Sequence, residues 1–120
     1  MTPAEFEKLV LEALDQIPDE ISDRLDNVDV VVEDWPTSEQ MAGSGIEDGH
    51  YLLGLYEGIP LTDRYGYDMV LPDKITLFQK PIEAICASDE EIVGEVRATV
   101  VHEVAHHFGI DDASLEQMGV

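Results

Sequence analysis

The chain has 120 residues, of which 44% are hydrophobic, so we expect a single domain over residues 1–120 with a real core. Its 27 acidic and 6 basic residues give a net charge of −21, which argues against nucleic-acid binding through a basic patch. No apolar run approaches the roughly 20 residues of a membrane span, and the acidic N-terminus does not resemble a secretory signal. We therefore expect a cytoplasmic protein without a membrane partner, and nothing in the sequence predicts an oligomeric state.

The first predicted element is a helix that begins at Pro3. Thr2-Pro3-Ala4-Glu5 is a capping box with proline at the first helical position. Apolar residues then recur at helical spacing until Pro18 ends the run: Phe6, Leu9, Val10, Ala13, Leu14 and Ile17. A short helical turn is expected next, through Ile21 and Leu25.

Three strands are predicted after these helices. Residues 28–32 have a β-branched run, and residues 51–56 (YLLGLY) and 74–79 (KITLFQ) are the second and third strands. The turn-rich stretches between them, 34–50 and 58–73, are long for loops; each is either a flap over a site or a disordered surface loop. Residues 75–78 (ITLF) are either an edge strand that pairs with an extended peptide or a central strand.

The last long element is a helix from about residue 89 to Phe108, opened by a second capping box, Ser88-Asp89-Glu90-Glu91. Its apolar side is formed by Ile92, Val93, Val96, Val100, Val104 and Phe108. A narrow stripe elsewhere on the helix is formed by Glu95, Thr99, His102 and His106. The histidines are therefore expected where a cleft can form, beside the core.

Four further residues are expected to be structural. Cys86 is the only cysteine, which excludes an internal disulfide. Because it lies in an apolar run, it is predicted to be a small core residue. We expect Arg97 to form a partly buried pair with a carboxylate and His107 to have a packing role. A final short helix is predicted around residues 114–118, with Met118 in the core.

Residues 102–112 (HEVAHHFGIDD) match the pattern H-E-x-x-H-x-x-G-x-x-[H/D]. Residues four apart share one helix face, so His102 and His106 can bind one Zn²⁺. Glu103 lies about 100° round the helix, which suits a base that holds a water better than it suits a third ligand. Gly109 permits a left-handed turn, after which Asp112 can reach the metal. Three protein ligands with one open position are typical of a catalytic zinc site.

The alternative is that His102 and His106 are ordinary helix-face histidines, Gly109 is only a C-cap, and Asp112 only caps the next helix. Two observations favour the metal site. Three of the four histidines in the chain fall within six residues, at 102, 106 and 107, with the fourth at His50. Glu103 occupies the internal position that the chemistry requires.

The chain also resembles a family of small bacterial proteins, the minimal zincin-like metallopeptidase family. The matching stretches are residues 52–62 (LLGLYEGIPLT), 71–83 (LPDKITLFQKPIE) and 96–112 (VRATVVHEVAHHFGIDD). The resemblance implies an α+β, zincin-like fold in which the HExxH helix packs on one face of a small sheet. It also implies zinc at His102, His106 and Asp112, with Glu103 as general base. The chain departs from larger metzincins in its aspartate third ligand and in having only eight residues after it.

We therefore expect a zinc-dependent hydrolase of peptide bonds that uses metal-activated water and acts on peptides or an exposed protein segment. One alternative is a non-catalytic, zinc-stabilised interaction module derived from a peptidase. Another is a zinc-dependent nuclease, against which both Glu103 and the net charge argue.

Overall fold

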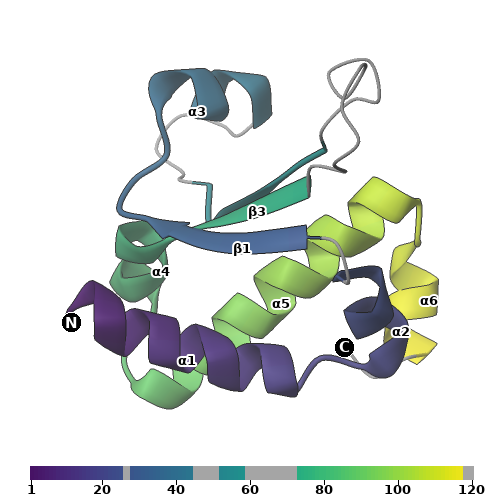
Figure 1. Cartoon of the computed structure of the whole chain (residues 1–120), viewed down its shortest axis with the longest axis horizontal. Coiled ribbons are helices and arrows are strands. Elements are labelled where there is room, and N and C mark those ends of the chain that lie inside the picture. Colours follow the sequence, from purple (N-terminus) through teal and green to yellow (C-terminus); the bar gives the residue numbers. More distant parts are fainter. Residues whose placement is uncertain (26–27, 45–51, 59–72, 118–120) are drawn as a thin grey trace, which may run out of the picture.

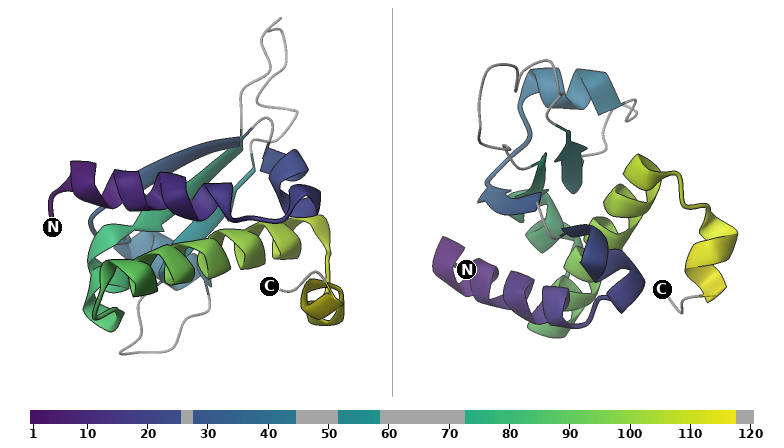
Figure 2. Two further views of the ribbon diagram at one scale, coloured as in Figure 1. Left: turned by 90° about the horizontal axis from the view of Figure 1, so that it is seen from below. Right: turned by 45° about the vertical axis from the view of Figure 1, so that its right-hand side comes forward.

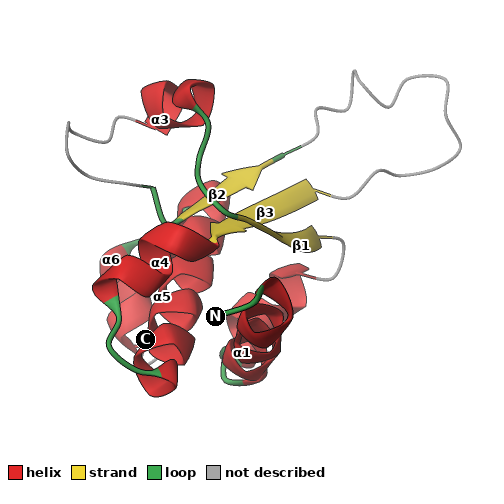
Figure 3. Cartoon of the chain, turned by 90° about the vertical axis from the view of Figure 1, so that its left-hand side faces the viewer, coloured by secondary structure: helices red, strands yellow, loops and turns green. Residues whose placement is uncertain are grey.

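The computed structural model describes residues 1–25, 28–44, 52–58 and 73–117 (Figures 1 and 3). Its elements are α1 (Pro3–Asp15), α2 (Asp19–Ser22), the 3-10 helix η1 (Asp23–Leu25), β1 (Val28–Glu33), α3 (Ser38–Ser44), β2 (Gly54–Glu57), β3 (Asp73–Phe78), α4 (Gln79–Ile85), α5 (Asp89–Phe108) and α6 (Asp112–Gln117). The predicted α+β class is confirmed. None of the described helices is long and apolar enough to cross a membrane.

Helix α1 begins and packs as its sequence predicts. The Thr2 hydroxyl accepts a bond from the Glu5 amide (3.2 Å), and the Glu5 carboxylate accepts one from the Thr2 amide (3.3 Å). These reciprocal bonds satisfy two amides that would otherwise lack partners in the first turn. The helix ends at Asp15, before Pro18, and buries Phe6, Leu9, Val10 and Ala13.

The three strands form a mixed sheet in the order β1-β3-β2. β1 runs parallel to β3, with Val30 opposite Ile75, and β2 runs antiparallel to it, with Tyr56 opposite the same Ile75. Residues 75–78 are all buried, as expected for a strand with a neighbour on each side. Because both sides of β3 are paired, the prediction that ITLF is an edge that captures a peptide is wrong.

Helices α1 and α5 lie side by side below the sheet, and α3 lies above it (Figures 1 and 2). α5 contacts α1, α4, β2 and β3. The core lies between these two helices and the sheet, and its fully buried members include Phe6, Ile75, Leu77, Val96, Val100 and Val104. Cys86 packs against this core and is a free thiol, as predicted.

Two helices lie where the sequence did not predict them. α3 falls within the stretch 34–50, and a reciprocal pair of bonds between Thr37 and Gln40 opens it (2.8 and 3.1 Å), as in a capping box. α4 begins at Gln79, which the sequence predicts as the last residue of the third strand. β2 begins at Gly54, three residues later than predicted, and Tyr51, most of 58–73 and Met118 lie outside the described residues.

Candidate metal centre

Helix α5 carries the HExxH motif and is anchored at its start by Ser88. The Ser88 hydroxyl accepts a bond from the Glu91 amide (3.2 Å). The Glu91 carboxylate bonds the Ala87 amide, one residue before the position that a reciprocal capping box would use. The buried side of the helix is formed by Ile92, Val93, Val96, Val100, Val101, Val104 and Ala105.

Phe108 departs from the predicted buried side of α5. Its side chain is 42% exposed. The Arg24 guanidinium lies 5.1 Å from its ring centroid, and the His107 ring meets it edge-on at 4.9 Å. Phe108 is therefore a surface contact between α5 and η1, held in part by a cation–π interaction.

His102 and His106 are both exposed on the same face of α5, one turn apart. Their ring centroids are 6.1 Å apart and their planes are inclined by 52°. Two imidazoles on one tetrahedral Zn²⁺ have centroids about 5 Å apart, given Zn–N bonds of about 2.0–2.1 Å. Rotation of the exposed side chains covers the difference of roughly 1 Å, so the pair fits one zinc ion.

Glu103 is directed towards β2. Its Oε2 accepts a hydrogen bond from the Tyr56 amide (3.3 Å), and the side chain is half-buried. Burial raises the pKa of the Glu103 carboxyl, and the Tyr56 amide, His106 and His102 partly offset that effect. A carboxylate with a raised pKa is a stronger base than an exposed glutamate.

The turn after α5 has the conformation that the sequence predicts. Gly109 is left-handed (φ 73°), the Ile110 amide donates to the Ala105 carbonyl (2.8 Å), and the Gly109 amide donates to the His106 carbonyl (3.3 Å). This is the pattern of a Schellman turn. It directs the chain back so that α6 begins at Asp112.

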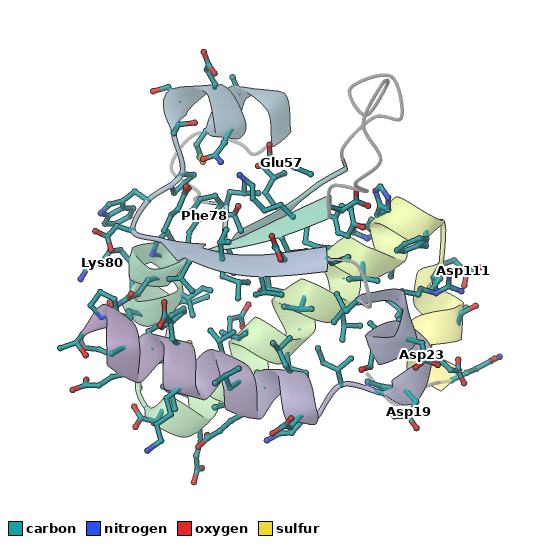
Figure 4. The ribbon with its side chains drawn as sticks, viewed as in Figure 1. Asp19, Asp23, Glu57, Phe78, Lys80 and Asp111 are labelled. Atoms are coloured by element: carbon teal, nitrogen blue, oxygen red, sulfur yellow. The ribbon has the colours of Figure 1, made fainter. Side chains whose placement is uncertain are left out.

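Asp111, and not Asp112, caps α6 (Figure 4). Its Oδ1 accepts a bond from the Ser114 amide (2.8 Å), and that bond lowers the pKa of the Asp111 carboxyl. The N-cap position of α6 thus belongs to Asp111, one residue before Asp112. Asp112 is the first residue of α6, and its side chain lies outside the described residues.

Among the described residues, no three His, Cys, Asp or Glu side chains are grouped to hold a metal ion. The predicted ligand set includes the Asp112 side chain, which lies outside the described residues and so outside this statement. The described part of the centre is thus a histidine pair with a half-buried glutamate beside it.

The sequence did not single out Tyr56, which joins β2 to the motif. Besides the bond from its amide to Glu103, its ring stacks on His107 (centroids 3.9 Å apart, planes at 22°). Its hydroxyl donates to Asp73 Oδ2 (2.7 Å), and burial together with this bond raises the phenol pKa. His107 thus has the expected packing role, although it is exposed.

Arg97 differs from its prediction. Its Nη1 donates to the side-chain oxygen of Gln16 (3.4 Å), so the partner that the structure shows is an amide on the residue after α1, not a carboxylate. This contact joins the two long helices without a buried ion pair.

A cavity of about 330 Å³ lies between the start of β2 and α5 and reaches the motif. It is lined by Leu52, Leu53 and Gly54 on one side and by Glu95, Ala98, Thr99, His102 and Glu103 on the other. Gly54 is needed here, because a Cβ at this position would lie 2.5 Å from Thr99 Cγ2. A glycine within a predicted strand is a signal of close approach, so YLLGLY carried a hint of this contact.

Comparisons with known proteins agree with this architecture. The family model described as zincin-like metallopeptidase matches residues 25–120. No curated protein matches the chain. A solved structure of a conserved hypothetical protein from Thermo thermophilus is similar, with a TM-score of 0.56 and 23% identity over 90% of this chain and 94% of that one. At this identity the likeness concerns the fold alone.

Proposed function

The chain belongs to the zincin-like metallopeptidase family, and from that premise we propose that it is a zinc-dependent hydrolase of peptide bonds. The proposed substrates are peptides or exposed segments of cytoplasmic proteins. One observation carries the proposal: a half-buried glutamate with a raised pKa lies beside two exposed histidines, at the end of a cavity.

His102, His106 and Asp112 would hold the zinc ion. Imidazole and carboxylate are ordinary zinc donors, and three protein ligands leave a position open for catalysis. When bound, zinc supplies a Lewis acid that polarises the scissile carbonyl and lowers the pKa of water. The Schellman turn at Gly109 supports this assignment, since it ends α5 and changes the direction of the chain three residues before Asp112.

Glu103 is the proposed general base. It takes a proton from the attacking water and passes it to the departing amine. The Tyr56 amide holds one carboxylate oxygen of Glu103 at 3.3 Å and so limits the orientations of the side chain. The stack of Tyr56 on His107 keeps this amide against α5. Tyr56 is therefore a positioning residue in the proposed mechanism.

The test compares wild type, Glu103→Gln and His106→Ala for zinc content and for cleavage of a broad peptide library. Glutamine keeps an acceptor for the Tyr56 amide but cannot take a proton. We expect Glu103→Gln to retain about one zinc per chain and to lose at least about 100-fold in rate, while His106→Ala loses both.

Two results would count against the proposal. Cleavage by Glu103→Gln at the wild-type rate would remove the assigned base. Wild-type protein that holds zinc and cleaves no peptide would favour the non-catalytic, zinc-stabilised interaction module.

A further inference from the structure

The cavity beside the motif extends well beyond the residues of the proposed reaction. It runs along α5 from Glu103 and His102 to Glu95, which lies seven residues before His102 in the helix. Seven residues of α-helix span about 10.5 Å. Between these ends the lining is apolar or small: Leu52, Leu53, Gly54, Ala98 and Thr99. The cavity therefore has a catalytic end, an apolar middle and a carboxylate at its far end.

Glu95 has no hydrogen-bond or ion-pair partner in the described parts of the chain, although its side chain is partly buried. Two of the described cations have other partners: Arg97 donates to Gln16, and Lys80 lies 3.8 Å from Glu83. A partly desolvated carboxylate without a cation is less stable than one with a partner. The far end of the cavity is thus prepared for a positive charge.

A second carboxylate, that of Glu91, adds to the negative potential around Glu95. Glu95 and Glu91, after burial itself, both raise the pKa of the Cys86 thiol. No described cation offsets these two carboxylates, and the chain as a whole carries a net charge of −21. A ligand group that enters this end of the cavity therefore gains most if it is a cation.

We propose that this cavity is a specificity pocket for a lysine or arginine side chain of the substrate, with the cation at the Glu95 carboxylate. The inference rests on the proposed function, since it places the substrate backbone at His102 and Glu103. A lysine side chain has an apolar stem of about 6 Å and a charged end. Together with the Glu95 side chain, that stem covers the distance of about 10.5 Å along α5, and Leu52, Leu53 and Ala98 contact its methylenes.

Binding can be tested without catalysis in a Glu103→Gln background. Blocked alanine pentapeptides, with lysine placed at each of the five positions in turn, are titrated into the protein with Zn²⁺ present and followed by NMR. Each peptide is matched by one with norleucine at the same position. At about 0.15 M salt we expect the best lysine peptide to bind about five- to tenfold more tightly than its match. It should shift the amide signals of Leu53, Ala98 and Thr99.

Three substitutions locate the source of that preference. Glu95→Gln should remove it and leave norleucine binding unchanged, and Glu95→Lys should transfer the preference to peptides that carry glutamate. Glu90→Gln removes the same charge from an exposed position on α5 that does not line the cavity. It should leave the preference intact, which separates the pocket from the general field of the molecule.

Equal binding of lysine and norleucine peptides would overturn the inference, as would equal losses for Glu95→Gln and Glu90→Gln, or shifts that avoid the cavity. The outcome is separable from that of the proposed function. Cleavage by wild type with no preference for basic residues keeps the function and rejects the pocket. Glu95-dependent binding without cleavage of any lysine peptide keeps the pocket and rejects the function.

Discussion

Asp111 and Asp112 are adjacent aspartates with different positions at the start of α6. The Asp111 carboxylate is committed to the Ser114 amide and caps the helix. Asp112 follows as the first helical residue. The sequence alone left open whether Asp112 binds zinc or caps the next helix, and it did not indicate a role for Asp111. The hydrogen bond assigns the cap to Asp111, and zinc binding by Asp112 stays a prediction.

Asp112→Ala should therefore lower zinc affinity by more than about 100-fold. Loss of an outer-shell partner typically costs 10- to 100-fold, so loss of a direct ligand should cost more. Competition with a chelator of known affinity measures the effect. Asp111→Ala is the matched control: it should weaken α6 and lower the Tm, with a much smaller change in zinc affinity. Equal affinities for wild type and Asp112→Ala would remove Asp112 from the ligand set.

Glu103 should make metal-free protein less stable at neutral pH. Its pKa is raised in the folded state, chiefly by burial. The folded state thus binds the proton more tightly than the unfolded state, so the ionised carboxylate costs stability as the pH rises through the folded pKa. Below about pH 4 the carboxyl is protonated in both states and this cost disappears.

We therefore expect metal-free Glu103→Gln to have a higher Tm than metal-free wild type at pH 7. The difference should shrink as the pH falls towards 4. Thermal unfolding in the presence of a chelator across this pH range measures it, with Glu90→Gln as the exposed control on the same helix. A variant that is less stable than wild type at pH 7 would show that the glutamate carboxylate, on balance, stabilises the fold.

At the scale of elements, the centre depends on how closely β2 approaches α5. Gly54 lies against Thr99 with no room for a Cβ, and Tyr56 contacts both Glu103 and His107 from the same strand. β2 thus closes one side of the cavity and holds the proposed base. An increase in the distance between β2 and α5 would change both the shape of the cavity and the position of Glu103.

Gly54→Ala should destabilise the protein by about 1–3 kcal/mol, the usual cost of overpacking. The added Cβ would lie 2.5 Å from Thr99 Cγ2, so β2 and α5 must separate. Thr99→Ser removes that methyl group, and the double variant should recover most of the loss. Denaturant unfolding of the four proteins completes the cycle. Additive losses in the double variant would show that the clash is not with Thr99.

The predictable elements are those whose signals are local. The capping box at Thr2, the apolar period of α5 and Gly109 each act within a few residues, and each is confirmed, with Phe108 as the exception on the apolar side of α5. α4 was missed because Gln79 continues an apolar strand pattern. In the structure its buried amide donates to Glu83, one helical turn on, and to the Met1 carbonyl, 78 residues away, a contact that sequence spacing does not reveal.

In the site, too, the contacts between residues close in sequence could be predicted, and those between distant residues could not. His102, Glu103 and His106 are brought together by one helix, so their spacing predicts their relative positions. The bond from the Tyr56 amide to Glu103 joins residues 47 apart in sequence. It depends on the pairing of β2 with β3, and the order of the strands was not predicted. The helix wheel already placed Glu95 and Thr99 on the histidine stripe, but only the cavity shows what lies opposite them.

For the whole molecule, the net charge of −21 should make stability depend on salt. Carboxylates such as Asp19 and Asp23 lie at the surface, and they repel one another over distances that about 1 M salt screens (Figure 4). We expect the Tm to rise by at least about 4 °C between about 0.05 and 1 M NaCl, equivalent to about 1 kcal/mol for a domain of this size.

A variant with fewer charges provides the control. Asp29→Lys with Glu33→Lys replaces two exposed acids of β1, which changes the net charge from −21 to −17, because each substitution adds two units. Its Tm should respond less to NaCl. If salt lowers the wild-type Tm, or raises both Tm values equally, self-repulsion is not a significant cost to this fold.

The most direct test of the central claim is to titrate metal-free wild-type protein with Zn²⁺ while measuring hydrolysis of a peptide library. We predict that the rate rises in proportion to added zinc and stops rising at about one equivalent per chain, and that a chelator reverses it. A rate that is independent of zinc, or no hydrolysis at one equivalent, would contradict the assignment of this chain as a zinc-dependent peptidase.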